Sequence, residues 1–183
     1  VLMMGGLKIS EKAHTLENLG KQVDQILLGG GIANSLLAER GYEVGSTLIE
    51  TESKVVAKRL LRNFRHKIML PVDLIVANKK MEPSSIRVTE AHGVKKNEII
   101  LDIGPKTILQ YSRGLKKAKT IVWNGPMGYF ERKPFHTGTL SLARIVGGVS
   151  KGRCYGVVGG GETVDALRLA KQEQYVDHVS TGG

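Results

Sequence analysis

The stretch that decides the fold is Thr120-Ile121-Val122-Trp123-Asn124-Gly125-Pro126-Met127-Gly128, a short apolar run that ends in a glycine turn. The same pattern opens the chain, where Val1-Leu2-Met3-Met4 stops at Gly5-Gly6 and apolar residues then follow at helical spacing. It returns at residues 25–31, 155–161 and 177–183. Repeated units of strand, glycine turn and helix predict a parallel sheet with helices on both faces, because strands buried on both sides are apolar throughout.

We therefore predict an α/β fold: a three-layer αβα, Rossmann-like, mostly parallel sheet in a single domain over residues 1–183. Residues 98–101 predict a further strand that leads into a helix at Pro105, and the polar residues 79–97 predict a surface excursion with one short strand near residues 86–88. The strand-to-helix turns of such a sheet lie at one edge, where ligands bind. Glycine turns beside helix N-termini suit phosphate, since the backbone can approach closely and N–H groups there are free.

Length and composition describe a folded globular chain. The 183 residues are 41% apolar and 24% charged, which argues against disorder, a collagen-like repeat and a disulfide-stapled miniprotein. No apolar run approaches the roughly 20 residues of a membrane span, no secretory signal opens the chain, and the single Cys154 fits a reducing compartment, so we expect a cytoplasmic protein. Because the first residue is Val and the last strand ends at Gly183, we expect part of a longer chain.

Charge favours an anionic partner, since the net charge is +10. The basic residues lie in scattered pairs typical of a solvated surface and only 5% of residues are aromatic, so nucleic acid is the weakest alternative. The P-loop motif is absent, and residues 29–34 and 159–164 match the dinucleotide fingerprint only in part. Lys8 and Lys12 follow the first glycine turn at a spacing that predicts one helix face, a poor position for cations unless they bind a polyphosphate.

Seven motifs, in order along the chain, resemble phosphoglycerate kinase, and specifically the carboxyl-terminal, nucleotide-binding half of that family. They are residues 5–12, 29–34, 70–73, 101–107, 122–131, 159–163 and 180–183. The run Trp123-Asn124-Gly125-Pro126, followed by Gly128, Phe130 and Glu131, is the most specific of them. The resemblance extends over essentially the whole chain and implies that the amino-terminal half of the family, which binds 3-phosphoglycerate, lies outside this sequence.

The resemblance implies a phosphate end of the site that binds ADP or ATP with Mg²⁺. Lys8 would meet the transferring phosphoryl group and Lys12 the nucleotide phosphates, since neutralising charge is the main service of a phosphoryl-transfer site. Glu162 would hold Mg²⁺, although the family usually has Asp at that position. Gly182 and Gly183 would begin a helix that faces the transferred group. Further phosphate contacts would come from Asn124, Gly160, Gly161 and Thr163.

The resemblance implies a base end of the site as well. Gly29, Gly30, Leu101 and the turn from Pro126 to Tyr129 would form an adenine slot, in which missing side chains let the flat base lie against backbone. Tyr129 stands where the family has a smaller aliphatic residue, so it would stack on the base or narrow the slot. The hydroxyl groups of the ribose would bind Glu131.

The function implied by the resemblance is that of a glycolytic kinase, which transfers a phosphoryl group between 1,3-bisphosphoglycerate and ADP. We expect this chain to be a monomer that binds MgADP or MgATP with little turnover, without nucleic acid or membrane partners. It would meet 3-phosphoglycerate or 1,3-bisphosphoglycerate only together with the amino-terminal half. The alternative is a stand-alone nucleotide-binding module without catalytic activity. The five histidines are expected to be surface or packing residues, because no metal-ligand spacing connects them. Cys154 precedes a predicted buried strand and is expected to be an inert small hydrophobe, and Trp123 at a strand end is expected to belong to the core or the slot wall.

Overall fold

Side chains of the first strand alternate between two separate apolar clusters. Met3 packs with Leu27 and Trp123 on one side of the strand, whereas Leu2 and Met4 pack on the other. This alternation is the period of a β-strand, and it buries both faces of the sheet, as the unbroken apolar runs predict. The computed structural model describes residues 1–180, so the predicted glycine turn at 181–183 lies outside the described residues.

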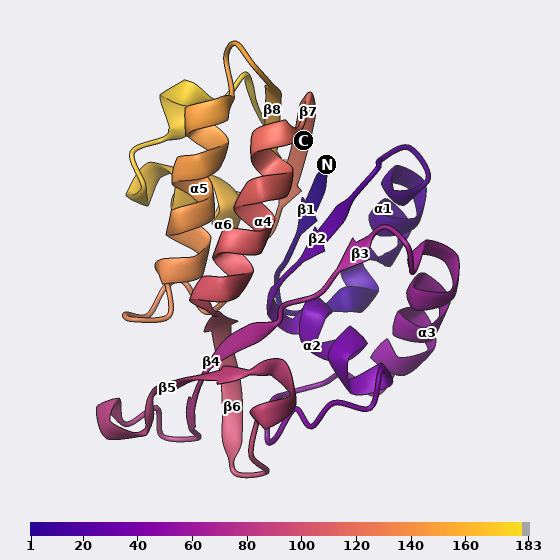
Figure 1. Ribbon diagram of the computed structural model, residues 1–183, viewed down its shortest axis with the longest axis vertical. Coiled ribbons are helices and arrows are strands. Elements are labelled where there is room, and N and C mark those ends of the chain that lie inside the picture. Colours follow the sequence, from indigo (N-terminus) through magenta and orange to yellow (C-terminus); the bar gives the residue numbers. More distant parts are fainter. Residues whose placement is uncertain (181–183) are drawn as a thin grey trace.

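The main sheet is parallel, with its strands in the order β3-β2-β1-β7-β8-β9. Its strands are β1 (Leu2–Met4), β2 (Ile26–Leu28), β3 (Ile68–Met69), β7 (Thr120–Asn124), β8 (Tyr155–Gly159) and β9 (His178–Ser180). The helices are α1 (Ile9–Gly20), α2 (Gly30–Glu39), α3 (Ser53–Phe64), α4 (Pro105–Lys117), α5 (Thr137–Val149) and α6 (Gly161–Leu169). Helices α1–α3 share one apolar cluster with the sheet and α4–α6 the other, so the sheet runs between two helical layers (Figure 1). The predicted three-layer α/β fold is confirmed.

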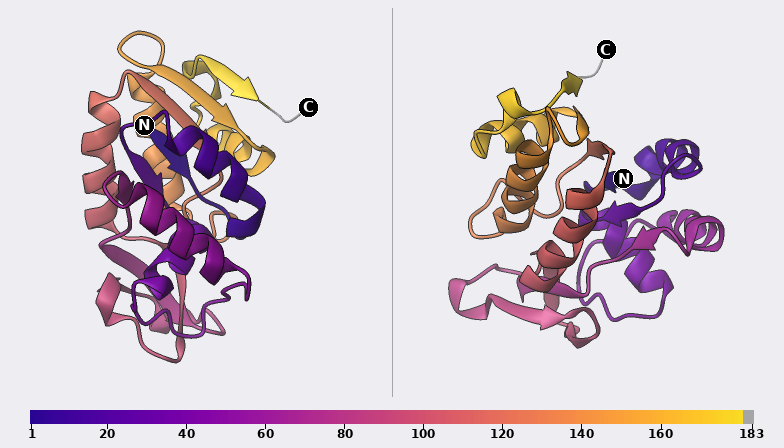
Figure 2. Two further views of the ribbon diagram at one scale, coloured as in Figure 1. Left: turned by 90° about the vertical axis from the view of Figure 1, so that its right-hand side faces the viewer. Right: turned by 45° about the horizontal axis from the view of Figure 1, so that its top comes forward.

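A second, smaller sheet is antiparallel, with its strands in the order β5-β4-β6. Its strands are β4 (Asp73–Asn78), β5 (Arg87–Glu90) and β6 (Glu98–Ile103). The strands predicted at residues 98–101 and near residues 86–88 are therefore present, but they lie outside the parallel sheet, because an apolar run does not reveal the direction of its partner strand. Both views of Figure 2 have this sheet at the end of the molecule opposite β9.

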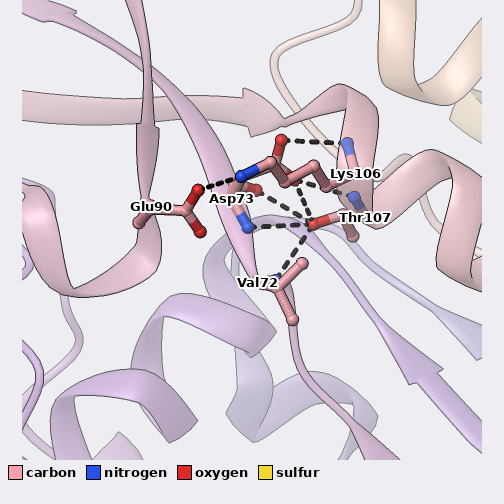
Figure 3. A network of polar contacts seen from close by, with 5 residues as sticks. All are labelled: Val72, Asp73, Glu90, Lys106 and Thr107. Atoms are coloured by element: carbon pink, nitrogen blue, oxygen red, sulfur yellow. Dashed lines mark hydrogen bonds and ion pairs between the residues drawn. The ribbon is translucent and has the colours of Figure 1, made fainter.

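The two sheets are joined where β4 meets the start of α4 (Figure 3). The buried carboxylate of Asp73 accepts hydrogen bonds from the backbone N–H of Lys106 at 2.9 Å and of Thr107 at 2.7 Å. The Thr107 hydroxyl donates to the same carboxylate and accepts from the Val72 N–H at 3.0 Å, while Lys106 forms an ion pair with Glu90. Because the first N–H groups of a helix have no partner inside it, Asp73 supplies the cap that α4 needs. It thereby fixes the small sheet to α4, which packs against the main sheet.

The helices within residues 1–180 are not of the membrane-spanning type. None of them combines the length and the apolar character that crossing a bilayer requires.

Candidate functional site

The turns that follow β1, β2 and β7 are hydrogen-bonded to one another through backbone atoms. Gly6 N–H donates to the Pro126 carbonyl at 2.9 Å, Gly30 N–H to the Met127 carbonyl at 2.8 Å, and Gly31 N–H to the Gly6 carbonyl at 2.9 Å. Three segments far apart in the sequence therefore form one continuous backbone surface at the carboxyl edge of the sheet. The predicted meeting of the glycine turns at this edge is confirmed for these three.

Glycine is required here because the segments approach too closely for side chains. A Cβ atom on Gly31 would lie 2.0 Å from the Leu7 carbonyl oxygen, and one on Gly125 would lie 2.2 Å from the Gly5 carbonyl oxygen. Gly125 also has a φ of +91°, in the region that other residues rarely adopt. The glycines thus serve the close packing of the turns as well as any ligand that binds to them.

A cleft of about 460 Å³ lies beside this backbone surface. Several predicted base-site residues line it: Gly30, Leu101, Pro126, Tyr129 and Glu131. Glu162, the predicted metal ligand, lines it too. The cleft therefore has apolar walls and two exposed carboxylates, those of Glu131 and Glu162. Such a cleft suits a flat apolar group that also carries polar or cationic ends.

The small antiparallel sheet forms one wall of the cleft. Tyr129 N–H donates to the Leu101 carbonyl on β6 at 2.7 Å, which attaches the turn after β7 to that sheet. Ile99, Ile100 and Ile103 on the same strand also line the cleft. The loop at residues 46–48 and Met81 also line the cleft. The sequence did not predict them, because loop residues carry no periodic pattern.

Lys12 and Asn124 lie beside the cleft near Gly6 and Glu162, although neither is part of the cleft lining. The Lys12 ammonium donates to the side-chain oxygen of Asn124. Burial lowers the pKa of Lys12 below its usual value, and the nearby carboxylates of Glu162 and Glu11 oppose that shift. The side chain of Asn124 lies in turn beside Gly160, whose φ is +89°. A half-buried ammonium that rests on a neutral amide is well placed to take up a further anionic partner.

Lys8 has a different environment from Lys12. It occupies the N-cap of α1 with an extended backbone, so helical spacing does not place it on the face of Lys12. Its side chain is exposed and pairs with Glu11 at 3.3 Å. In the described structure Lys8 is therefore a solvated cation beside the first turn.

Other predicted phosphate contacts differ in their exposure. Gly161 is exposed at the start of α6, whereas Thr163 is fully buried and its hydroxyl oxygen accepts the Gly125 N–H at 2.6 Å. Gly29, which was predicted to belong to the adenine slot, is buried against Met127 and is not part of the cleft lining. Gly182 and Gly183 lie outside the described residues.

No group of three or more His, Cys, Asp or Glu side chains that could hold a metal ion exists within residues 1–180. Glu162 is an exposed carboxylate without a hydrogen bond or ion pair in that part of the chain. Cys154 is buried among the apolar residues of the core, and burial raises the pKa of its thiol.

The fold and the cleft define an α/β protein of the class that binds ligands at the carboxyl edge of a parallel sheet. The family model described as phosphoglycerate kinase matches residues 1–183, and the chain belongs to this family. A phosphoglycerate kinase from Chloroflexus aggregans is 40% identical over 186 residues, which cover 100% of this chain and 46% of that protein. The chain thus spans about half the length of the curated relatives it matches.

Solved structures agree with that assignment. The structure of phosphoglycerate kinase from Coxiella burnetii superposes with a TM-score of 0.91 at 39% identity, over 100% of this chain and 47% of the other. Phosphoglycerate kinase from Pyrococcus horikoshii superposes with a TM-score of 0.81 at 28% identity, over 100% and 46%. Both alignments include every described element, so the fold is that of the corresponding part of these kinases.

Proposed function

We propose that this chain is the nucleotide-binding part of a phosphoglycerate kinase and that the cleft binds the adenine nucleotide. The observation that carries the proposal is the junction, at one sheet edge, of an apolar cleft with a half-buried ammonium and an exposed carboxylate. A nucleoside diphosphate has the matching sequence of parts: a flat base, a ribose and a polyanionic end.

The base would lie in the cleft between Leu101 and the turn from Pro126 to Tyr129, against the backbone of Gly30. Glu131 would accept hydrogen bonds from the ribose hydroxyls at the mouth of the cleft. Tyr129 is 43% exposed, so its ring is free to close over a bound base. Gly29 would support the slot from behind, since it is buried against Met127.

The phosphates would lie over the turns after β7 and β8. Lys12 and Asn124 would bind them from one side, with the backbone of Gly160 and Gly161 on the other and Thr163 holding the turn in place. Lys8 would turn from Glu11 toward the transferring phosphoryl group, and Gly182 and Gly183 would complete the anion site. Such groups lower the barrier by positioning and charge neutralisation, without a protein nucleophile.

Mg²⁺ fits this donor set. Magnesium in phosphate sites takes one or two carboxylates and completes its shell with phosphate oxygens and water, so the single carboxylate of Glu162 is sufficient. When bound, the ion would neutralise charge on the phosphates. Glu162 would hold it near Lys12, since the Glu162 carboxylate is close enough to oppose the lowering of the Lys12 pKa.

Calorimetric titration with MgADP tests the proposal. We expect saturable binding of MgADP and weaker binding of pyrophosphate, which has no base. Pyrophosphate is the necessary control because a chain of net charge +10 would attract it by charge alone. Equal affinity for ADP and pyrophosphate would contradict a base slot. We expect kinase turnover of this chain to be near background, because in the family the amino-terminal half binds the glycerate substrate. Full kinase activity would refute the separation of the two substrate sites between the two halves.

A further inference from the structure

Asp102 is a buried carboxylate that no proposed nucleotide contact uses. It lies on β6, is 2% exposed, and belongs to the lining of the cleft. Its Oδ2 accepts the Gly138 N–H at 2.7 Å and its Oδ1 accepts the Ile103 N–H at 2.9 Å. A charged group buried beside a ligand cleft is costly, so its presence calls for a reason beyond packing.

Three parts of the chain converge on this carboxylate. A Cβ atom on Gly128 would lie 2.4 Å from Asp102 Oδ1, and so would one on Gly138. Gly128 is on the turn that lines the cleft, Gly138 is in the first turn of α5, and Asp102 itself is on β6. The carboxylate therefore occupies the point where the cleft wall, a helix of the main layer and the small sheet meet.

We propose that Asp102 is a positioning residue of the nucleotide cleft: in its ionised form it holds the first turn of α5 against β6, directly beside Gly128 of the turn from Pro126 to Tyr129, and so sets the wall on which the base rests. The inference depends on the proposed function, because it assumes that a base binds in this cleft. Both carboxylate oxygens accept a backbone N–H, and the negative charge complements the N-terminal end of the α5 dipole. Protonation would turn one acceptor into an O–H donor that faces an N–H, and that bond would weaken.

The charge of the Asp102 carboxyl depends on pH. Burial raises the pKa of the Asp102 carboxyl to about 7, and the two amide hydrogen bonds limit the rise. The elements that pack against β6, and β6 itself, carry these titratable or charged groups: Tyr129, Glu131, Arg132 and Lys133 on the segment before α5, His136 at its start, Arg144 within α5, Asp73 on β4, Glu39 on α2 and Glu98 on β6. This set contains one histidine, His136, and its substitution serves as the control.

Affinity and stability should change in opposite directions with pH. The pKa of Asp102 is higher in the folded chain than its usual value of 3.8, so folding favours the protonated form, and its contribution to the free energy of unfolding falls as the pH rises from about 4 to about 7. Affinity for the base should instead rise with the ionised fraction. A purely structural role of Asp102 would make affinity follow stability.

The experiment measures adenosine affinity by calorimetry at pH 6 and pH 8, because adenosine carries no phosphate that titrates. With a pKa of about 7, the ionised fraction of Asp102 falls from about 0.9 at pH 8 to about 0.1 at pH 6. We therefore expect the affinity for adenosine to be up to about ninefold weaker at pH 6 than at pH 8. Asp102→Asn should remove this pH dependence and His136→Gln should retain it. The Asn amide preserves size without an ionisation.

The outcomes separate the inference from the function on which it rests. Absence of ADP and adenosine binding at every pH would refute the proposed function. Binding with no difference between pH 6 and pH 8, persistence of the difference in Asp102→Asn, or its loss in His136→Gln would overturn the role of Asp102. If Asp102→Asn does not fold, the wild-type and His136→Gln profiles decide the matter by the same criteria.

Discussion

Replacement of Lys12 by alanine tests the phosphate end of the site most directly. The Lys12 ammonium is half-buried, bonds to the neutral amide of Asn124, and has a pKa that burial lowers. A bound diphosphate would give it a charge-assisted hydrogen bond, a type worth about 1.5 to 3 kcal/mol. Lys12→Ala should therefore weaken ADP binding about 10- to 150-fold in isothermal titration calorimetry.

Two controls make the Lys12 result specific. Adenosine affinity should be unchanged in Lys12→Ala, since no phosphate is present. Lys8→Ala should cause a smaller loss of ADP affinity, because Lys8 is exposed and already paired with Glu11. ADP affinity should also fall as the pH rises through the lowered pKa of Lys12, where its ammonium loses its charge. Equal losses for adenosine and ADP, or for the two lysine variants, would refute the reasoning.

Three further substitutions test the metal site, the glycine edge and the joint between the sheets. Glu162→Gln should abolish most of the gain in ADP affinity that Mg²⁺ confers, measured as the ratio of ADP affinities with and without the ion. An unchanged ratio would mean that Glu162 acts only as a favourable charge at the N-terminus of α6. Gly31→Ala should lower the free energy of unfolding by about 1 to 3 kcal/mol in urea denaturation, since its Cβ would lie 2.0 Å from the Leu7 carbonyl, and a stability equal to wild type would contradict that packing. Asp73→Asn should cost about 1 to 3 kcal/mol by leaving an α4 amide without its acceptor, whereas the exposed Asp165→Asn serves as a control and should change stability little.

The sheet was predictable because its signal is local. The strands Leu2–Met4 and Ile26–Leu28 are apolar throughout, are buried and are followed by glycine, so the sequence pattern and the burial agree there. The outer strands carry a weaker signal, because Ile68–Met69 is followed by Leu70 and Pro71, and His178–Ser180 is polar and exposed at both ends. The small sheet was only partly predictable. Its strand β6 is apolar as well, and antiparallel pairing with β4 depends on a partner that no local pattern identifies.

The sequence predicted those residues of the candidate site that belong to glycine turns. It did not predict the residues that loops bring to the cleft. Residues 46–48 reach the cleft through the tertiary course of a loop, which neither spacing nor composition predicts. The separation of Lys8 from Lys12 depends on where α1 begins, since Lys8 at the N-cap has an extended backbone. Asp102 did carry a signal, an acidic residue inside an apolar strand, but its burial and partners became evident only in three dimensions.

The central position of β1 bears on how the chain assembles. Leu2 pairs with Ile26 on one side and with Val122 on the other, so the middle of the sheet closes only after most of the chain has come together. Contacts of such long range slow folding, because the entropy of closing a large loop must be overcome before the pairing stabilises anything. The backbone surface made by the turns after β1, β2 and β7 cannot exist before that closure. A ligand bound across these turns would therefore stabilise the closed sheet, and its dissociation should precede global unfolding.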